Sequence, residues 1–183
     1  HAKKIKFAVD MTGQTILSTG VHIAGDFQTL AGFPDGDWMS NTTPLTPEMG
    51  NPNIYSIVVD IPAFAKYEYK FINGDQFYET EFVPEESRVG YNFNDNRWIY
   101  VDSLADDTTY VGAILFSQNA PSGYHLLRFK VNMMNETVSS NGVHLASSFQ
   151  GWNTTNTFLY SFGNDVYEAI AYIENTEISC DYK

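Results

Sequence analysis

Residues 20–28 read Gly-Val-His-Ile-Ala-Gly-Asp-Phe-Gln, and residues 142–150 read Gly-Val-His-Leu-Ala-Ser-Ser-Phe-Gln. These stretches belong to a longer match, in which residues 5–30 repeat as residues 127–152 without a gap and 11 of 26 positions are identical. An internal repeat of this length predicts two copies of one structural unit.

The repeat continues beyond this block after a change of spacing. The block has a shift of 122 positions, whereas Tyr55 matches Tyr167 at a shift of 112. The difference predicts a ten-residue insertion in the first copy, within residues 29–43. The ungapped block places Leu30 opposite Trp152.

The matched segments define the expected domains. We expect a β-sandwich module over residues 1–102, a partly docked linker over residues 103–124 and a second module over residues 125–183 that lacks its C-terminal strands. The apolar run at residues 111–116 favours docking, because flexible linkers rarely contain one. Missing strands would leave backbone unpaired, so we also expect contacts with other domains of a longer polypeptide.

Apolar and polar residues alternate with period two along most of the chain, and helical periodicity is almost absent. Ile5 and Phe7 share one face of an expected strand, and residues 67–72 form another that ends at the hairpin signal Asn73-Gly74. Short strands separated by turns predict β-sandwiches, so the expected fold class is all-β.

The composition excludes several classes of partner. The chain has 10 Lys and Arg against 22 Asp and Glu, a net charge of −12, which repels nucleic-acid phosphates and anionic membrane surfaces. Its longest apolar run, residues 111–116, is too short for membrane insertion. The single Cys180 excludes a disulfide within the chain and leaves the redox compartment open.

Three segments together resemble one known family. They are residues 21–28, the step Pro44-Leu45-Thr46, and the strand with its hairpin at residues 67–74. In this order they resemble the starch- and glycogen-binding modules of the early-set, immunoglobulin-like type. The resemblance implies tandem immunoglobulin-like β-sandwiches. Tandem copies also resemble the repeated modules of large bacterial proteins that are secreted or attached to the cell surface, which implies an extracellular location.

The same resemblance implies a set of sugar-binding residues. In binding members of the family, sugar rings stack on a Trp after the Gly-x-Phe motif and on an aromatic residue past the hairpin, while a Lys and an Asn donate hydrogen bonds. Carried over by position, the candidates are Trp38, Lys70, Phe77 and Asn96 in the first copy and Trp152 and Lys183 in the second. A pyranose fits such a set, because its C–H face packs on aromatic rings and its hydroxyls need fixed polar partners.

The chemistry-bearing residues also have structural interpretations. Trp38 and Trp152 can instead plug the end of a sandwich, and the repeated His22 and His144 lie between apolar strand neighbours, where a structural role is expected. Asp35-Gly36-Asp37 and Asn94-Asp95-Asn96 offer oxygens to Ca²⁺, but turn chemistry explains both, so we expect no metal and no cofactor.

A cluster of carboxylates raises the question of glycoside hydrolysis, which needs two carboxylates across a cleft. The cluster comprises Glu79, Glu81, Glu85 and Glu86. On the edge of a small sandwich we expect a solvated face that discourages aggregation.

These observations predict a non-catalytic, extracellular pair of modules with carbohydrate-binding ancestry, which binds α-glucan-type glycan weakly through exposed aromatics. The alternative is a structural, adhesive or filament-forming repeat of a larger bacterial surface protein, whose partners are other proteins or further copies of itself. The sequence contains no Gly-x-Ser-x-Gly elbow, phosphate-binding glycine loop or Cys-x-x-Cys pair, so we expect no enzyme.

Overall fold

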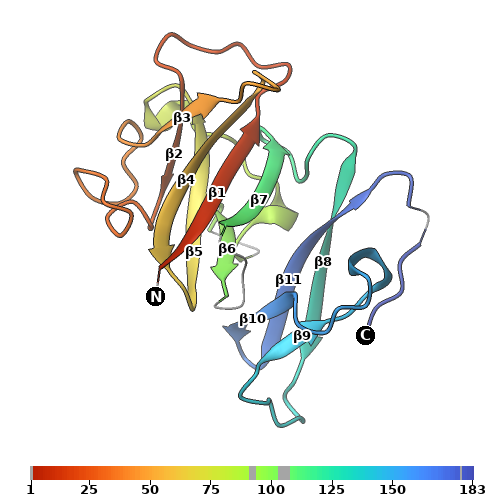
Figure 1. Cartoon of the computed structure of the whole chain (residues 1–183). Coiled ribbons are helices and arrows are strands. Elements are labelled where there is room, and N and C mark those ends of the chain that lie inside the picture. The colour runs from red at the N-terminus through yellow and green to blue at the C-terminus, as the bar shows by residue number, and fades with distance from the viewer. Residues whose placement is uncertain (1, 91–93, 103–107, 178) are drawn as a thin grey trace. The chain divides into compact units, whose positions relative to one another are not determined.

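The chain divides into two compact units, residues 1–122 and 123–183. The computed structural model describes residues 2–90, 94–102, 108–177 and 179–183. Strands β1 to β7 lie in the first unit and β8 to β11 in the second (Figure 1). The regular structure of the described residues consists of strands and short 3-10 helices, which confirms the all-β prediction.

The strands account for most of both units. Those of the first unit are β1 (Ala2–Asp10), β2 (Val21–Gly25), β3 (Pro44–Pro47), β4 (Ile54–Pro62), β5 (Ala65–Asn73), β6 (Arg97–Val101) and β7 (Thr108–Leu115). Those of the second unit are β8 (Tyr124–Asn132), β9 (Val143–Leu145), β10 (Thr157–Gly163) and β11 (Val166–Glu174). The 3-10 helices are η1 (Phe77–Glu79), η2 (Glu85–Ser87) and η3 (Ser148–Gln150). No helix in the described part of the chain is long and apolar enough to cross a membrane.

The short strand β3 connects the two layers of the first unit. The strand order is β6-β5-β2-β3-β4-β1-β7. Leu45 of β3 pairs with Val21 of β2, while the next residue, Thr46, pairs with Ser56 of β4. β3 therefore joins a layer of β6, β5 and β2 to a layer of β4, β1 and β7. Side chains from both layers share one core.

Alternate residues of β1 fill this core, as the period-two pattern predicts. Ile5, Phe7 and Val9 are fully buried. The Phe7 ring contacts the rings of Tyr69 and Phe27, with centroids 4.8 Å and 4.9 Å away. Burying an aromatic side chain contributes roughly 1.5–3 kcal/mol, so these contacts hold β5 against the opposite layer.

The predicted solvated carboxylate face is wrong at Glu81. Its side chain is fully buried, and its Oε1 lies 2.6 Å from Nη2 of Arg97, whose side chain is 3% exposed. The carboxylate also accepts the backbone N–H groups of Phe71 at 2.9 Å and Ser117 at 3.3 Å. The prediction failed because alternation along one strand does not show which distant cation lies opposite.

Part of the stretch assigned from the sequence to a linker has regular structure. Residues 108–115 form β7, which pairs in parallel with β1. The first unit extends to Ser122. Residues 103–107 of the expected linker lie outside the described residues.

The second unit, taken by itself, repeats the central pairing of the first. Its strand order is β8-β11-β10-β9. Val131 of β8 lies opposite Tyr167 of β11, as Val9 of β1 lies opposite Tyr55 of β4. The buried residues of its smaller core are Leu145, Leu159 and Ala169.

Candidate functional site

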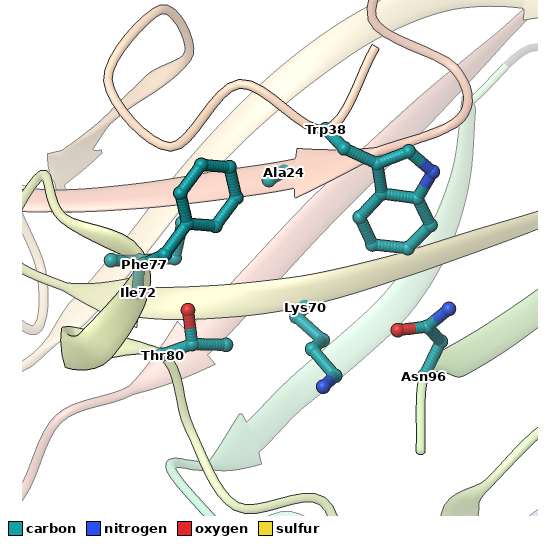
Figure 2. Close-up of a pocket in the computed structure, with 7 residues that line it drawn as sticks. All are labelled: Ala24, Trp38, Lys70, Ile72, Phe77, Thr80 and Asn96. Atoms are coloured by element: carbon teal, nitrogen blue, oxygen red, sulfur yellow. The ribbon is translucent and has the colours of Figure 1, made fainter. Parts of the chain in front are cut away.

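A hollow in the surface of the first unit brings together five segments of the chain (Figure 2). These are β2, the loop after β2, β5, the segment around η1 and the residues before β6. The lining residues are Ala24, Trp38, Lys70, Ile72, Phe77, Thr80 and Asn96. All four first-copy candidates from the sequence lie in this set. The hollow measures about 210 Å³, so it would hold part of a longer ligand.

Two aromatic rings stand on different sides of the hollow. Figure 2 shows Trp38 and Phe77 apart from each other, with Ala24 and Lys70 between them. Phe77 is 63% exposed and Trp38 is half-buried. The side chain of Ala24 is only a methyl group, so it does not project far into the space between the two rings. This arrangement offers apolar faces to a flat C–H surface, such as one side of a pyranose.

The hairpin turn after β5 positions Phe77. Gly74 has a φ of +133°, and a Cβ at this position would collide with the Glu79 carboxylate, so glycine is required. That carboxylate accepts the backbone N–H groups of Asp75 and Gln76, each at 2.9 Å. Glu79, predicted to belong to a solvated edge, thus caps the 3-10 helix that carries Phe77.

A buried glutamine fixes the backbone beside Trp38. Trp38 has a φ of +61°, and its N–H donates to the Gly25 carbonyl at 3.1 Å. The fully buried Gln28 accepts the Met39 N–H and donates to the Met39 carbonyl, both at 3.0 Å. Its Nε2 also donates to Thr43 Oγ1 at 2.9 Å. Left-handed backbone costs a non-glycine residue about 1–2 kcal/mol, which these bonds offset.

The second unit contains the same arrangement around Trp152. This residue has a φ of +58°, and its N–H donates to the Ser147 carbonyl at 2.8 Å. Gln150 accepts the Ser147 N–H at 3.3 Å and donates to the Asn153 carbonyl at 2.7 Å. It also donates to Thr157 Oγ1 at 3.3 Å. Gln28 likewise accepts the N–H of Gly25, the counterpart of Ser147, at 3.2 Å. We call the bonds that both glutamines make the glutamine clamp: from the N–H of the residue three before, to the carbonyl after the tryptophan and to the threonine.

The glutamine clamp identifies Trp38 as the structural counterpart of Trp152, which corrects the ungapped alignment with Leu30. Nine residues separate Gln28 from Trp38, whereas one separates Gln150 from Trp152. The difference of nine minus one places eight inserted residues between the glutamine and the tryptophan of the first copy.

The Lys70 side chain, which lines the hollow, forms an ion pair with Asp95. Its Nζ lies 2.7 Å from Asp95 Oδ1, and the two side chains are 17% and 52% exposed. The hydrogen bond from Lys70 is the main reason that the pKa of Asp95 lies below its usual value. Burial opposes it, and the positive charges of Lys70 and Arg88 lower the pKa by smaller amounts.

Asn96 is held by a carboxylate beside the hollow. Its Nδ2 donates to Glu68 Oε1 at 3.1 Å, and Asn94 donates to the same oxygen at 2.6 Å. Burial raises the pKa of Glu68, but the hydrogen bonds from Lys66, Asn96 and Asn94 outweigh it and leave the pKa below its usual value. Asn96 is therefore fixed in place before any ligand arrives.

The two segments considered for Ca²⁺ make turn contacts. Asn94 Oδ1 accepts the Asn96 N–H at 3.1 Å, and Asp37 Oδ1 accepts the Thr29 N–H at 2.7 Å. Across the described residues, no three His, Cys, Asp or Glu side chains are grouped so that they could hold a metal ion.

The repeated histidines contact their own unit. His22 Nδ1 lies 2.6 Å from the Gly74 carbonyl, which ties β2 to the hairpin after β5. The His144 ring contacts Phe158 edge to face, with centroids 5.1 Å apart. Both histidines thus contact residues of their own unit, and their structural role stays a prediction.

The second unit presents two of the candidate residues. Trp152 is exposed, and Lys183 exchanges both backbone hydrogen bonds with Ala146, as Lys70 pairs with Ala24 in the first unit. Trp152 and Lys183 thus occupy the positions of Trp38 and Lys70.

The Lys70–Asp95 pair predicts a pH dependence. The pKa of Asp95 is lowered in the folded protein, so its contribution to stability is complete above the unfolded value, near pH 4, and is lost as the pH falls through the folded value. At pH 7, Asp95→Asn should lower the free energy of unfolding by about 0.5 kcal/mol, because the pair is partly exposed. This difference should vanish on acidification. Urea denaturation of both proteins across this range measures it, and a pH-independent difference would contradict the pairing.

The chain shows little similarity to known proteins. No family model matches the sequence, and no curated protein matches it. Among solved structures, the chain is similar to the crystal structure of a Gamma-CGTase from alkalophilic Bacillus clarkii, with a TM-score of 0.41 and 18% identity. The match covers 64% of this chain and 15% of that chain, so this chain spans a small fraction of that protein's length.

Proposed function

We propose that the chain is a non-catalytic, extracellular pair of modules that binds α-glucan-type glycan weakly, with the hollow of the first unit as its binding site. One observation carries the proposal. The family resemblance predicts four first-copy residues separately, from separate segments of the chain, and all four line one hollow: Trp38, Lys70, Phe77 and Asn96.

The chemistry of the hollow supports this function. Trp38 and Phe77 can each pack on the C–H face of a sugar ring. Lys70 and Asn96 lie between and beside them with polar atoms for hydroxyls. Because the hollow is small and open, few contacts are available, and we expect a Kd of about 0.1–1 mM, or roughly −4 to −5.5 kcal/mol.

Alanine substitution of the two rings tests the site. Trp38→Ala and Phe77→Ala should each weaken binding of a soluble α-glucan at least tenfold, since each removes about 1.5–3 kcal/mol of apolar contact. Tyr78→Ala is the matched control, because Tyr78 is the neighbour of Phe77, is 84% exposed and does not line the hollow. Affinity electrophoresis or NMR titration measures the effect. Binding by wild type that survives both substitutions would place the site elsewhere.

One observation favours the alternative, a structural or adhesive repeat that contacts protein. In the second unit Val131 and Tyr182 are exposed, whereas their counterparts Val9 and Tyr69 are buried in the first. Such apolar positions suit a protein partner. Sedimentation at rising concentration separates the two functions: self-association that Val131→Lys abolishes supports the protein contact, and a monomer that retains glucan supports the binding module.

A further inference from the structure

Two ion pairs lie at the hollow, Lys70–Asp95 and Lys66–Glu68. Of the seven lining residues, Lys70 carries the one formal charge, and Asp95 neutralises it at 2.7 Å. Beside Asn96, the Glu68 carboxylate is paired with the Lys66 ammonium. The seven lining residues together with Asp95 thus carry no net charge, in a chain whose net charge is −12.

The Lys70–Asp95 pair is arranged with its carboxylate toward solvent. Lys70 is mostly buried along the hollow, while half of the Asp95 side chain is exposed. A ligand that approaches Lys70 therefore meets the Asp95 carboxylate as well. An ammonium has three donors, so one can remain on Asp95 while another reaches a sugar hydroxyl, and that hydroxyl can in turn donate to a carboxylate.

We infer that Asp95 makes the hollow selective for uncharged glycans, because it holds the Lys70 ammonium and denies it to anionic sugars. This inference rests on the proposed function, and it names the substrate class of the same site. A neutral sugar uses the ion pair intact. A sugar carboxylate or sulfate must instead displace Asp95, leave that carboxylate next to its own charge, and approach against the field of the whole chain.

The substitution Asp95→Asn tests the selectivity. The probes are a soluble α-glucan and the same glucan oxidised at C6 to the uronate, which differ in charge and share a backbone. Wild type should bind the oxidised glucan at least tenfold more weakly than the neutral one. Asp95→Asn should raise affinity for the oxidised glucan about tenfold at low ionic strength and change neutral binding less than threefold. Added salt should remove the gain, because the released Lys70 charge is near the surface.

Asp60→Asn is the matched control. Asp60 also forms an ion pair with a lysine, Lys4, at 3.0 Å, and its loss removes the same single negative charge from the same unit. It does not line the hollow. Asp60→Asn should therefore leave both affinities unchanged, which separates release of Lys70 from the change in net charge.

The outcomes distinguish the inference from the function on which it rests. If wild type binds both glucans equally, or Asp95→Asn gains nothing on the oxidised glucan, the inference is overturned and the binding site stands. If wild type binds neither glucan, the proposed function and the inference fall together. Without any sugar, NMR titration of the Asp95 carboxyl should give a lowered pKa that rises in Lys70→Met, and a wild-type pKa that is not lowered would overturn the inference.

Discussion

Replacing Arg97 with methionine is expected to lower the free energy of unfolding by roughly 3–5 kcal/mol. The substitution strands the Glu81 carboxylate, which is fully buried and accepts from two Arg97 nitrogens at 2.6 Å and 3.0 Å. It also removes the Arg97 donor to the Gln118 carbonyl at 2.7 Å. A buried charge without its partner is among the costliest defects that one substitution creates.

A double-mutant cycle identifies the cause of this loss. Adding Glu81→Gln to Arg97→Met removes the stranded charge and keeps an oxygen for the Phe71 N–H, so the double variant should regain about 1–2 kcal/mol. The control is Lys4→Met, which breaks the exposed Lys4–Asp60 pair and should cost less than about 1 kcal/mol. Urea denaturation measures wild type, Arg97→Met, Glu81→Gln and the double variant for the cycle, and Lys4→Met as the control. A cost of Arg97→Met no larger than that of Lys4→Met would show that the pair is not buried in solution.

The Glu81–Arg97 ion pair also involves the sequence neighbours of two residues that line the hollow. Glu81 follows Thr80, which lines it, and Arg97 follows Asn96, which lines it from the other side. The pair therefore joins the segment after β5 to the start of β6, next in sequence to two residues that line the site. Variants that break it should lose glycan binding along with stability.

Gln28→Leu is expected to lower the free energy of unfolding by about 2–4 kcal/mol. Leucine fills a similar volume but leaves the Met39 N–H and carbonyl without their partner, and an unsatisfied buried polar group costs about 1–3 kcal/mol. Gln28→Glu keeps an acceptor oxygen but loses the amide donor. It should therefore lower the free energy of unfolding at least as much as the neutral substitution Gln28→Leu. The loop that carries Trp38 should exchange its amide hydrogens faster in both variants.

The second copy of the glutamine clamp supplies the control. Gln150→Leu makes the same chemical change beside Trp152 and should loosen the second unit without altering exchange near Trp38. In the first unit, glucan affinity should fall about as much in Gln28→Leu as in Trp38→Ala, because the ring loses its fixed backbone. Unchanged affinity in a folded Gln28→Leu protein would show that the clamp does not position the tryptophan.

Local patterns predicted the scaffold well. Period two placed Ile5 and Phe7 in the core, and Asn73-Gly74 ends β5 at the turn that presents Phe77. The candidates Lys70 and Phe77 came from the family resemblance, which carries them over because they lie at short, fixed spacings from that hairpin. Such signals involve residues that are close together in the sequence, so they can be recognised without knowledge of the fold.

Pairings between distant residues were not predicted. The Glu81–Arg97 pair and the parallel pairing of β7 with β1 join segments that share no local pattern. The family resemblance put Trp38 and Trp152 at the same position, but the ungapped alignment set Leu30 opposite Trp152 because it allows no insertion between the glutamine and the tryptophan. Aligning on the glutamines together with Thr43 and Thr157 would have found it.

The pairing of β3 with both layers of the first unit also reduces the number of strand edges that are open to another chain. Two separate three-stranded layers would present four open strand edges, each a template for another chain. Because β3 pairs with β2 on one side and β4 on the other, only β6 and β7 end the series of seven. The four-residue β3 thus covers part of the edge of β2, at Val21 and His22, and part of the edge of β4, at Tyr55 and Ser56.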